Sequence, residues 1–388
     1  MPIYADHAAT SPLRAAAREA MTEAFDLWGN PSSIHTSGRN AREALETARR
    51  TVATLLGAKP SEILFTSGGS ESNTTAIRSA AHFGARAGKR HIISTAIEHP
   101  SVQNTLRALA DEGFEIQLLP VTPEGYVTAV QVAAAIRPDT ALVAVMHANN
   151  EIGTVQPIRD IAAVCRERGV PLHTDAVQTV GHIPVNASEL GVDTLSLSGH
   201  KFGAPRGIGA LYIRKGVPFT PLIPGGHQES GRRAGTENLA GAMGMAAALT
   251  QAAERMEEEN DRLRSLSNTL AGEILRGIPD VRINGCPRCM SPYCDAPCSL
   301  PHIVSMTFGG IDGEALVYRL DAEGICISAG SACTAGSPDP SHVITALGVD
   351  PETALGTVRI SLGEGNTDGD VTRMAEAIVR IVTDLRRN

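Results

Sequence analysis

The stretch Asp193-Thr-Leu-Ser-Leu-Ser-Gly-His-Lys201 indicates what kind of sheet this chain builds. It is a β-prone run that stops at a small polar turn, so we expect a buried strand with Lys201 just past its carboxyl end. In open α/β sheets this edge is where ligands bind. Upstream, His173-Thr-Asp-Ala-Val-Gln178 predicts another short strand, with Asp175 at its end. An acid and a lysine therefore face the same edge.

A strand-end Asp followed by a strand-end Lys is the pair that pyridoxal phosphate (PLP) needs. The lysine attaches the cofactor's aldehyde covalently, and the carboxylate keeps the pyridine nitrogen protonated so that the ring withdraws electrons. Buried Lys and Asp are also found as structural ions, so the rest of the chain has to discriminate between the two interpretations.

The chain on either side alternates between strand-like and helical patterns. Strand-like runs lie at 62–66, 91–95, 114–121, 140–147, 170–175, 193–198 and 209–214. This predicts an α/β fold whose mostly parallel seven-stranded sheet is flanked by helices. The last third reads as a smaller α+β unit. We expect a large domain at 13–255 and a small domain made of 1–12 and 256–388.

Two groups of polar residues support a phosphate-bearing ligand. Thr66-Ser-Gly-Gly-Ser-Glu-Ser-Asn73 follows a strand and leads into a helix, where free N–H groups and the helix dipole face an anion. Such a turn is weak evidence by itself. The predicted strand ends add further functional groups that converge on one edge of the sheet: His99, Asn150, Asp175, Gln178, Ser198, His200 and Lys201.

Composition excludes several other classes of protein. The chain has 388 residues, of which 42% are hydrophobic and 20% charged, as in an ordinary globular protein. A net charge of −8 without a basic block argues against direct nucleic-acid binding. No apolar run is long enough to span a membrane and no signal peptide precedes the fold, so we expect a cytoplasmic protein.

The seven cysteines are unevenly distributed, which does not suggest a secreted disulfide framework. Cys333 lies in Ser328-Ala-Gly-Ser-Ala-Cys-Thr-Ala-Gly-Ser-Pro-Asp-Pro340, where Gly, Ser and Pro predict a loop, placed at about 326–342. An exposed thiol in a cytosolic protein is a liability unless its reactivity is used. We therefore interpret Cys333 as a nucleophile.

With these residues in place, the chain resembles the PLP-dependent cysteine desulfurases, the group that includes the NifS and IscS proteins, within the fold type I aminotransferase superfamily. The resemblance runs essentially from end to end. The motifs that carry it are Asp6-His-Ala-Ala-Thr10, Gly29-Asn-Pro-Ser-Ser33, Thr66–Asn73, Glu98-His99, Asn149-Asn-Glu-Ile-Gly153, Asp175-Ala-Val-Gln178, Ser198-Gly-His-Lys201, Arg233-Ala-Gly-Thr236, Ser331-Ala-Cys-Thr-Ala-Gly336 and Val358-Arg-Ile-Ser-Leu-Gly363.

The resemblance implies a role for each matching residue. Lys201 carries PLP, Asp175 pairs with the pyridinium, Gln178 bonds the ring hydroxyl, and His99 stacks on the ring and moves protons. Gly69, Ser70, Ser198 and His200 hold the phosphate, joined by Thr236 from the other subunit of a homodimer, and Gly199 and Asn150 also bind the cofactor. Substrate L-cysteine is held through its carboxylate by Asn30, Asn150 and Arg359. Cys333 takes the sulfur as a persulfide for an acceptor such as an iron–sulfur scaffold or a thiolation enzyme.

Three positions depart from the family pattern. Gly69-Ser70 stands where Ala-Thr is frequent, which keeps a hydroxyl, and Ala234 replaces a usual Ser. The largest departure is an insertion at 286–298, which holds Cys286, Cys289, Cys294 and Cys298. Four thiolates can bind zinc or an iron–sulfur cluster. Disulfides, free thiols and a persulfide relay fed by Cys333 remain alternatives. Cys333 itself is a further candidate cluster ligand during cluster transfer.

Two other functions remain open at this point. A selenocysteine lyase or an aminotransferase has the same fold, although a transaminase has no use for the thiol of Cys333. A dimeric platform for an iron–sulfur scaffold, with the insertion as a redox or metal sensor, is the alternative outside enzymes. Because Lys201, Asp175 and Cys333 are intact, that role would be an addition to catalysis.

Overall fold

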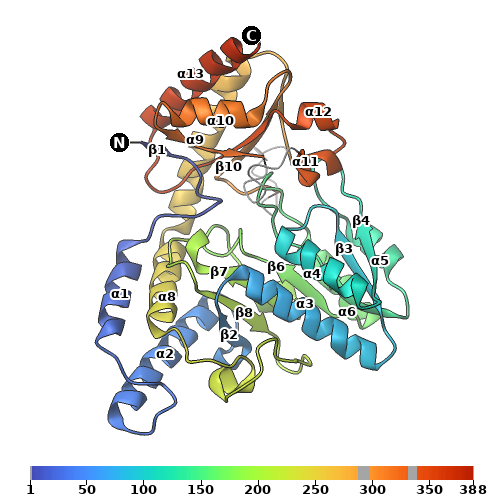
Figure 1. Cartoon of the computed structure of the whole chain (residues 1–388), viewed down its shortest axis with the longest axis vertical. Coiled ribbons are helices and arrows are strands. Elements are labelled where there is room, and N and C mark those ends of the chain that lie inside the picture. The colour runs from blue at the N-terminus through green and yellow to red at the C-terminus, as the bar shows by residue number, and fades with distance from the viewer. Residues whose placement is uncertain (1, 287–297, 331–338, 388) are drawn as a thin grey trace.

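The centre of the larger part of the molecule is a seven-stranded sheet (Figure 1). The computed structural model describes residues 2–286, 298–330 and 339–387. Strand order is β2-β8-β7-β6-β5-β3-β4, and β8 alone runs antiparallel to its neighbours. This confirms the predicted mostly parallel α/β sheet. The strands are β2 (Ile63–Thr66), β3 (His91–Thr95), β4 (Glu115–Leu119), β5 (Thr140–Ala144), β6 (Leu172–Asp175), β7 (Thr194–Ser198) and β8 (Gly209–Ile213).

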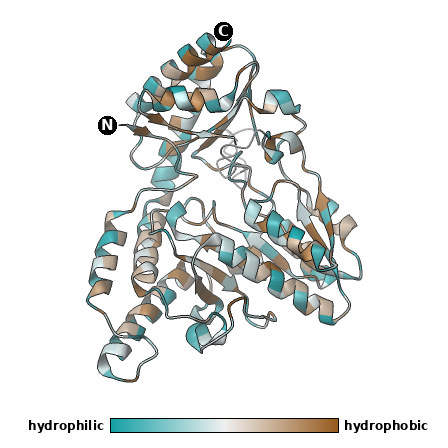
Figure 2. Cartoon of the chain, in the orientation of Figure 1, coloured by the Kyte–Doolittle hydropathy of each residue, from teal (hydrophilic) through white to brown (hydrophobic). Residues whose placement is uncertain are grey.

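Successive side chains on a strand point to opposite faces of the sheet, and both faces carry hydrophobic side chains, which explains why helices cover both. On β3 and β5, Ile92 and Leu142 pack with α3 (Gly69–Arg86) and α4 (Pro100–Asp111). Ile93 and Val143 point the other way, into a core shared with α6 (Ile158–Arg168). Figure 2 shows the hydrophobic colouring concentrated on the strands between these helices. The remaining helices of this part are α1 (Ala15–Phe25), α2 (Thr36–Leu55), α5 (Ala129–Ala135), α7 (Ala187–Leu190) and α8 (Leu239–Glu254).

A second core lies in the smaller part of the molecule, at the top of Figure 1. Its sheet has the order β12-β13-β10-β9, with every neighbouring pair antiparallel. The elements are β9 (Val281–Ile283), β10 (Ile303–Phe308), β12 (Ser328–Ala329) and β13 (Thr357–Ser361), with α9 (Met256–Gly277), α10 (Gly313–Asp321), α11 (His342–Ala346), α12 (Pro351–Ala354) and α13 (Asp368–Leu385). The core of the larger part also takes in Leu300 and Ile303. The boundaries at 13–255 and 256–388 stay a prediction.

The N-terminal segment belongs to the smaller part before it reaches the larger one. β1 (Ile3–Tyr4) pairs in parallel with β11 (Ile325–Cys326). Beyond β1, Asp6 forms a bridge with Ser361 of β13. The following residues then run toward the central sheet. The expected extended lead-in is therefore a strand of the small domain.

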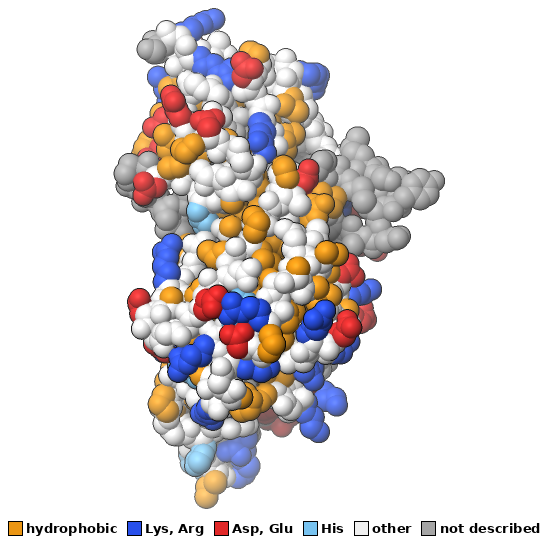
Figure 3. Space-filling view, turned by 90° about the vertical axis from the view of Figure 1, so that its right-hand side faces the viewer, with side chains coloured by type: hydrophobic (Ala, Val, Ile, Leu, Met, Phe, Trp, Pro, Cys, Tyr) orange, Lys and Arg blue, Asp and Glu red, His pale blue; other side chains and the backbone are white. Residues whose placement is uncertain are grey.

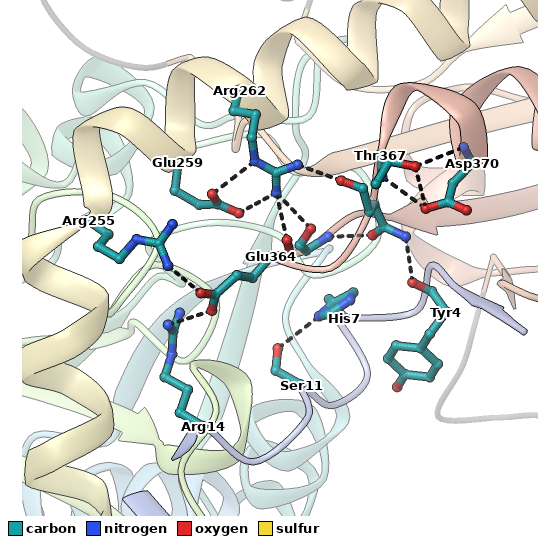
Figure 4. A network of polar contacts seen from close by, with 12 residues as sticks. Tyr4, His7, Ser11, Arg14, Arg255, Glu259, Arg262, Glu364, Thr367 and Asp370 are labelled. Atoms are coloured by element: carbon teal, nitrogen blue, oxygen red, sulfur yellow. Dashed lines mark hydrogen bonds and ion pairs between the residues drawn. The ribbon is translucent and has the colours of Figure 1, made fainter. Parts of the chain in front are cut away.

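An ionic network joins the two parts (Figure 4). Glu364 accepts hydrogen bonds from Arg14 at 2.8 Å and from Arg255 at 2.5 Å. Arg262 of α9 pairs with Glu259 and donates to the carbonyl oxygens of residues 363 and 366. Arg14 Nε also donates to the Phe202 carbonyl, which follows Lys201 directly. The network thus connects the C-terminal part to the turn that carries Lys201.

The surface seen in Figure 3 mixes both signs of charge. Acidic and basic side chains alternate there around hydrophobic ones. Within residues 2–286, 298–330 and 339–387, no helix is long and apolar enough to cross a membrane.

Candidate active site

A cavity of about 340 Å³ opens at the carboxyl ends of β6 and β7. This volume is within the range of small-molecule sites. Most of the predicted site residues line it, together with segments that lie far apart in the sequence: Ala8, Ala9, Gly69, Ser70, Asn73, His99, Ser101, Met146, Ala148, Asn150, Asp175, Val177, Gln178, Ser198, His200, Lys201 and Arg359.

Lys201 ends a short 3-10 turn, η2 (Gly199–Lys201), which begins directly after β7. Its Nζ donates to the carbonyl oxygens of Ala8 at 2.7 Å and Ala9 at 3.0 Å. The Ala8 carbonyl also accepts from Gln178 Nε2 at 2.9 Å. The N-terminal segment thus lines the cavity with backbone oxygens and holds Lys201 and Gln178 on one side of it.

Asp175 is held by a chain of buried hydrogen bonds. Its Oδ2 accepts from Asn73 Nδ2 at 2.6 Å, and its Oδ1 accepts from the Val177 backbone at 3.0 Å. Asn73 Oδ1 in turn lies 3.0 Å from His173 Nε2, and His173 Nδ1 lies 2.9 Å from Thr194 Oγ1. Burial lowers the pKa of His173 to about 3, so this ring is neutral. This chain of hydrogen bonds from Thr194 through His173 and Asn73 fixes the orientation of the carboxylate.

The phosphate cradle is the first turn of α3. Gly69 and Ser70 begin this long helix, so its free N–H groups point at the cavity. A Cβ atom on Gly69 would lie 2.6 Å from Val177 Cγ2, which explains the glycine. The same Cβ atom would lie 3.6 Å from Ser198 Cβ, so Ser198 lies beside the helix start, and His200 also lines the cavity. Burial, and then the charges of Lys201 and Arg206, lower the pKa of His200 to about 4.

His99 caps α4 and faces the cavity. Its Nδ1 accepts from the Ser101 backbone N–H at 3.1 Å, so the proton of the neutral ring is on Nε2. Burial is the main cause that lowers the pKa of His99, while the charge of Asp175 opposes the shift. The preceding Glu98 is fully buried, and burial raises its pKa to about 8. Its Oε1 accepts from Thr95 at 2.7 Å and from the Met146 N–H at 3.0 Å.

Arg359, on β13 of the smaller part, is one of the residues that line the cavity. It is 1% exposed. Its Nη2 pairs with Asp6 at 2.8 Å and its Nη1 donates to the Asn150 carbonyl at 2.8 Å. Nε is buried without a partner among the described residues. One N–H of the guanidinium is therefore left to bind a ligand in the cavity.

The segment that carries Cys333 lies outside the described residues, but its two ends are placed. Before it, Ser328 pairs with Arg359 across β12 and β13. After it, Ser341 Oγ donates to Glu151 Oε2 at 2.5 Å, and His342 Nε2 lies 3.1 Å from the Glu98 carbonyl oxygen. One end is therefore paired with Arg359, which lines the cavity, and the other contacts Glu151 and Glu98, the sequence neighbours of the lining residues Asn150 and His99.

Three predicted residues, Gly199, Asn30 and Thr236, are not among those that line the cavity of their own chain; Gly199 is buried in η2 between the lining residues Ser198 and His200. Asn30 is exposed, and its Oδ1 accepts from the Ser32 N–H. Thr236 is exposed in a loop that Arg233 ties to Glu71 of α3 at 3.0 Å. All three assignments stay predictions.

The Cys-rich insertion is described only at its ends. Cys286 and Cys298 are partly buried there, while Cys289 and Cys294 lie outside the described residues. Among the described residues, no group of three or more His, Cys, Asp or Glu side chains is placed to hold a metal ion. The predicted zinc or cluster site therefore stays a prediction.

Sequence reasoning gave no roles to Asn73, His173 and Thr194. A signal was present for His173, because it lies two residues before Asp175 on one strand and so points to the same side of the sheet. Thr194 is its register partner on β7. The Ala8 and Ala9 carbonyls had no side-chain signal at all.

Comparison with known proteins shows the family. Residues 3–374 match the model for "Aminotransferase class-V". The cysteine desulfurase IscS of Dictyoglomus turgidum is 46% identical over 385 residues, which are 99% of this chain and 95% of the relative. This chain belongs to the class-V aminotransferase family. Among solved structures, a NifS-like protein superposes with a TM-score of 0.91 at 36% identity and covers 99% of this chain and 100% of its own. A structure titled "SspA in complex with cysteine" gives 0.79 at 37% identity and covers 93% and 98%.

PLP, the cofactor of this family, fits the cavity. Gln178 Oε1 is buried and has no hydrogen-bond partner among the described residues, which suits an acceptor for the ring hydroxyl. The helix start at Gly69 suits a phosphate, and Asp175 suits a pyridinium. Lys201 is the amine within the lining.

Proposed function

We propose that this protein takes the sulfur of L-cysteine onto Cys333 and releases alanine, as a PLP-dependent cysteine desulfurase. The curated full-length relative supports the activity, and the cavity supports the cofactor. The observation that carries the proposal is the convergence of Lys201, Asp175 and Arg359 on this one cavity. The residues that flank the Cys333 segment contact Arg359 on one side and Glu151 on the other.

The residues divide the work as follows. PLP, when bound, supplies the electron sink that stabilises negative charge on the substrate carbon. Arg359, through its unpartnered Nε–H, and Asn150 orient the substrate carboxylate. Lys201 and the neutral His99 ring move protons to and from the carbon atoms of the substrate cysteine. The Cys333 thiolate attacks the substrate sulfur, so a new S–S bond forms while the C–S bond breaks, and the carbon is protonated to give alanine.

Cys333→Ser tests the nucleophile. We expect persulfide formation to be abolished while the absorbance of bound PLP is unchanged. Cys326 is a half-buried cysteine on β11, and the variant Cys326→Ser is the control, which should keep wild-type activity. If Cys333→Ser still converted cysteine to alanine at close to the wild-type rate, the assignment would be wrong.

We infer that the working unit is a homodimer in which Asn30 and Thr236 serve the partner's cavity. The support is that both residues lie outside their own cavity, and that the loop around Asn30 exposes large apolar side chains. Phe25 is 70% exposed, Trp28 82% and Ile34 86%. Such side chains are typical of a covered surface.

Light scattering tests the dimer. The double variant Trp28→Asp/Ile34→Asp should be monomeric and bind PLP more weakly, whereas Val130→Asp, at an equally exposed position on α5, should remain dimeric. A monomeric wild-type protein would refute this inference.

Two finer points complete the proposal. The persulfide sulfur passes to an acceptor protein, such as an iron–sulfur scaffold or a thiolation enzyme, and the setting is the cytoplasm. In the sequence the Cys333 segment connects β12 to α11, and a nucleophile on a connecting segment suits delivery to an external partner. Affinity capture with the persulfide-loaded enzyme, compared with Cys333→Ser, tests this step.

A further inference from the structure

Two cysteines outside the cavity meet at the base of the Cys-rich insertion. Cys286 follows β9 and Cys298 precedes β10, and both cysteines are partly buried. The side chains of the two residues lie within hydrogen-bonding distance of each other. Neither thiol takes part in the mechanism proposed above.

Contacts with residues 153–155 hold both ends of the insertion close together. The Cys286 N–H donates to Thr154 Oγ1 at 2.9 Å, and the Cys298 carbonyl accepts from the Val155 N–H at 3.1 Å. Ser299 forms an antiparallel bridge with Thr154. The residues at both ends of the insertion are thus attached to the same short segment, 153–155.

The approach to that segment is close enough to need a glycine. Gly285 has φ +88°. A Cβ atom there would lie 2.8 Å from the Ile152 carbonyl oxygen. The chain therefore enters Cys286 along one defined path, which limits the positions that its thiol can take.

We propose that Cys286 and Cys298 form a reversible disulfide that cross-links the two ends of the insertion on segment 153–155. The reaction is an exchange with a low-molecular-weight disulfide. One thiolate attacks that disulfide and releases a first thiol. The second thiolate then attacks the mixed disulfide and releases another. Each cysteine loses a proton, the pair loses two electrons, and the reagent is reduced to two thiols.

The setting makes the bond slow to form rather than permanent. The partly buried position of Cys286 limits the access of a disulfide reagent to its thiol. In a reducing compartment, disulfides are usually transient and report redox state. The cross-link would therefore mark prolonged oxidation.

The cross-link acts near the active site. Segment 153–155 continues from Asn150, which lines the cavity and whose carbonyl binds Arg359. Restraint of this segment should change the KM for cysteine more than the PLP content. This kinetic consequence rests on the proposed function, whereas the disulfide itself does not.

Peptide mapping of the full-length holoenzyme is the test. The protein is incubated with oxidised glutathione or with dithiothreitol, free thiols are alkylated, and the digest is analysed without reduction. We expect a peptide that links Cys286 to Cys298 after oxidation only. It should be absent from Cys286→Ser and from Cys298→Ser, and present in the control Cys326→Ser.

Hydrogen exchange gives a readout that is independent of activity. In the oxidised wild type, the peptide covering 149–155 should exchange more slowly than in the reduced protein, and Cys298→Ser should show no difference. Alkylation of both cysteines after oxidation would overturn the proposal. Disulfides that link either cysteine to Cys289 or Cys294 would also overturn it. So would a protein whose thiols become accessible to alkylation after treatment with a chelator but not after treatment with dithiothreitol.

Discussion

The cofactor cavity and the ionic network of Figure 4 both connect the N-terminal segment to the C-terminal third, but they do so in different surroundings. In the cavity, Asp175 is 5% exposed and Arg359 1%. In the network, the side chains of Glu364 and Arg255 are 42% and 48% exposed. Buried polar groups are costly to leave unpaired, whereas exposed ion pairs contribute little. Similar hydrogen-bond distances therefore have different energetic consequences.

The largest effect should come from Lys201→Ala. Its amine is the covalent anchor and a proton carrier, so we expect activity to fall by roughly 10²- to 10⁴-fold or more. Borohydride treatment followed by peptide mass spectrometry should find no PLP label on the variant. Lys215→Ala, just past β8, is the control and should be labelled at Lys201 as in the wild type. A labelled Lys201→Ala chain would contradict the anchor assignment.

Asn73→Ala should come next. It removes the donor to Asp175 and leaves His173 Nε2 without its acceptor. A buried hydrogen bond to a charged group contributes about 1.5–3 kcal/mol. PLP affinity, followed by absorbance titration, and thermal stability should both decrease. Asn104→Ala, an exposed position on α4, should change neither. If PLP bound Asn73→Ala as tightly as the wild type, the hydrogen-bonded chain would not be what holds Asp175.

Glu98→Gln should act on the pH dependence of stability. Burial raises the pKa of the folded carboxyl to about 8, above its ordinary value of 4.5. Between these values the folded state keeps a proton that the unfolded state releases, so the free energy of unfolding decreases as pH rises. Denaturant unfolding from about pH 5 to about pH 8 should show a smaller decrease for Glu98→Gln than for the wild type or for exposed Glu23→Gln. Equal slopes would show that Glu98 is already ionised in the folded protein.

The smallest effect should come from Glu364→Gln in the network. Exposed ion pairs contribute about 0.2–1 kcal/mol and are screened by salt. Thermal unfolding should show a small loss at low ionic strength that fades at high salt, with an unchanged KM. A loss as large as that of Asn73→Ala would mean that exposure does not separate the two regions.

Much of the cavity could be predicted, because its side chains follow strands whose hydrophobic patterns are clear. Lys201, Asp175 and Gly69 are where the sequence pattern and the resemblance place them. The parts that could not be predicted are those that depend on tertiary contacts. The carbonyls of Ala8 and Ala9 carry no side-chain signal, and only the structure shows that Asp6 neutralises Arg359. Likewise, no local pattern indicates that β8 runs antiparallel.

The path of the N-terminal segment has a consequence for the order of synthesis. Ile3 and Tyr4 leave the ribosome first, yet their partners, Ile325 and Cys326, emerge near the end. The partners of Asp6, which are Arg359 and Ser361, are synthesised later still. Until then the carbonyls that hold Lys201 and Gln178 have no fixed position. The cavity is therefore completed only when almost the whole chain has been made, and cofactor loading should be a post-translational event.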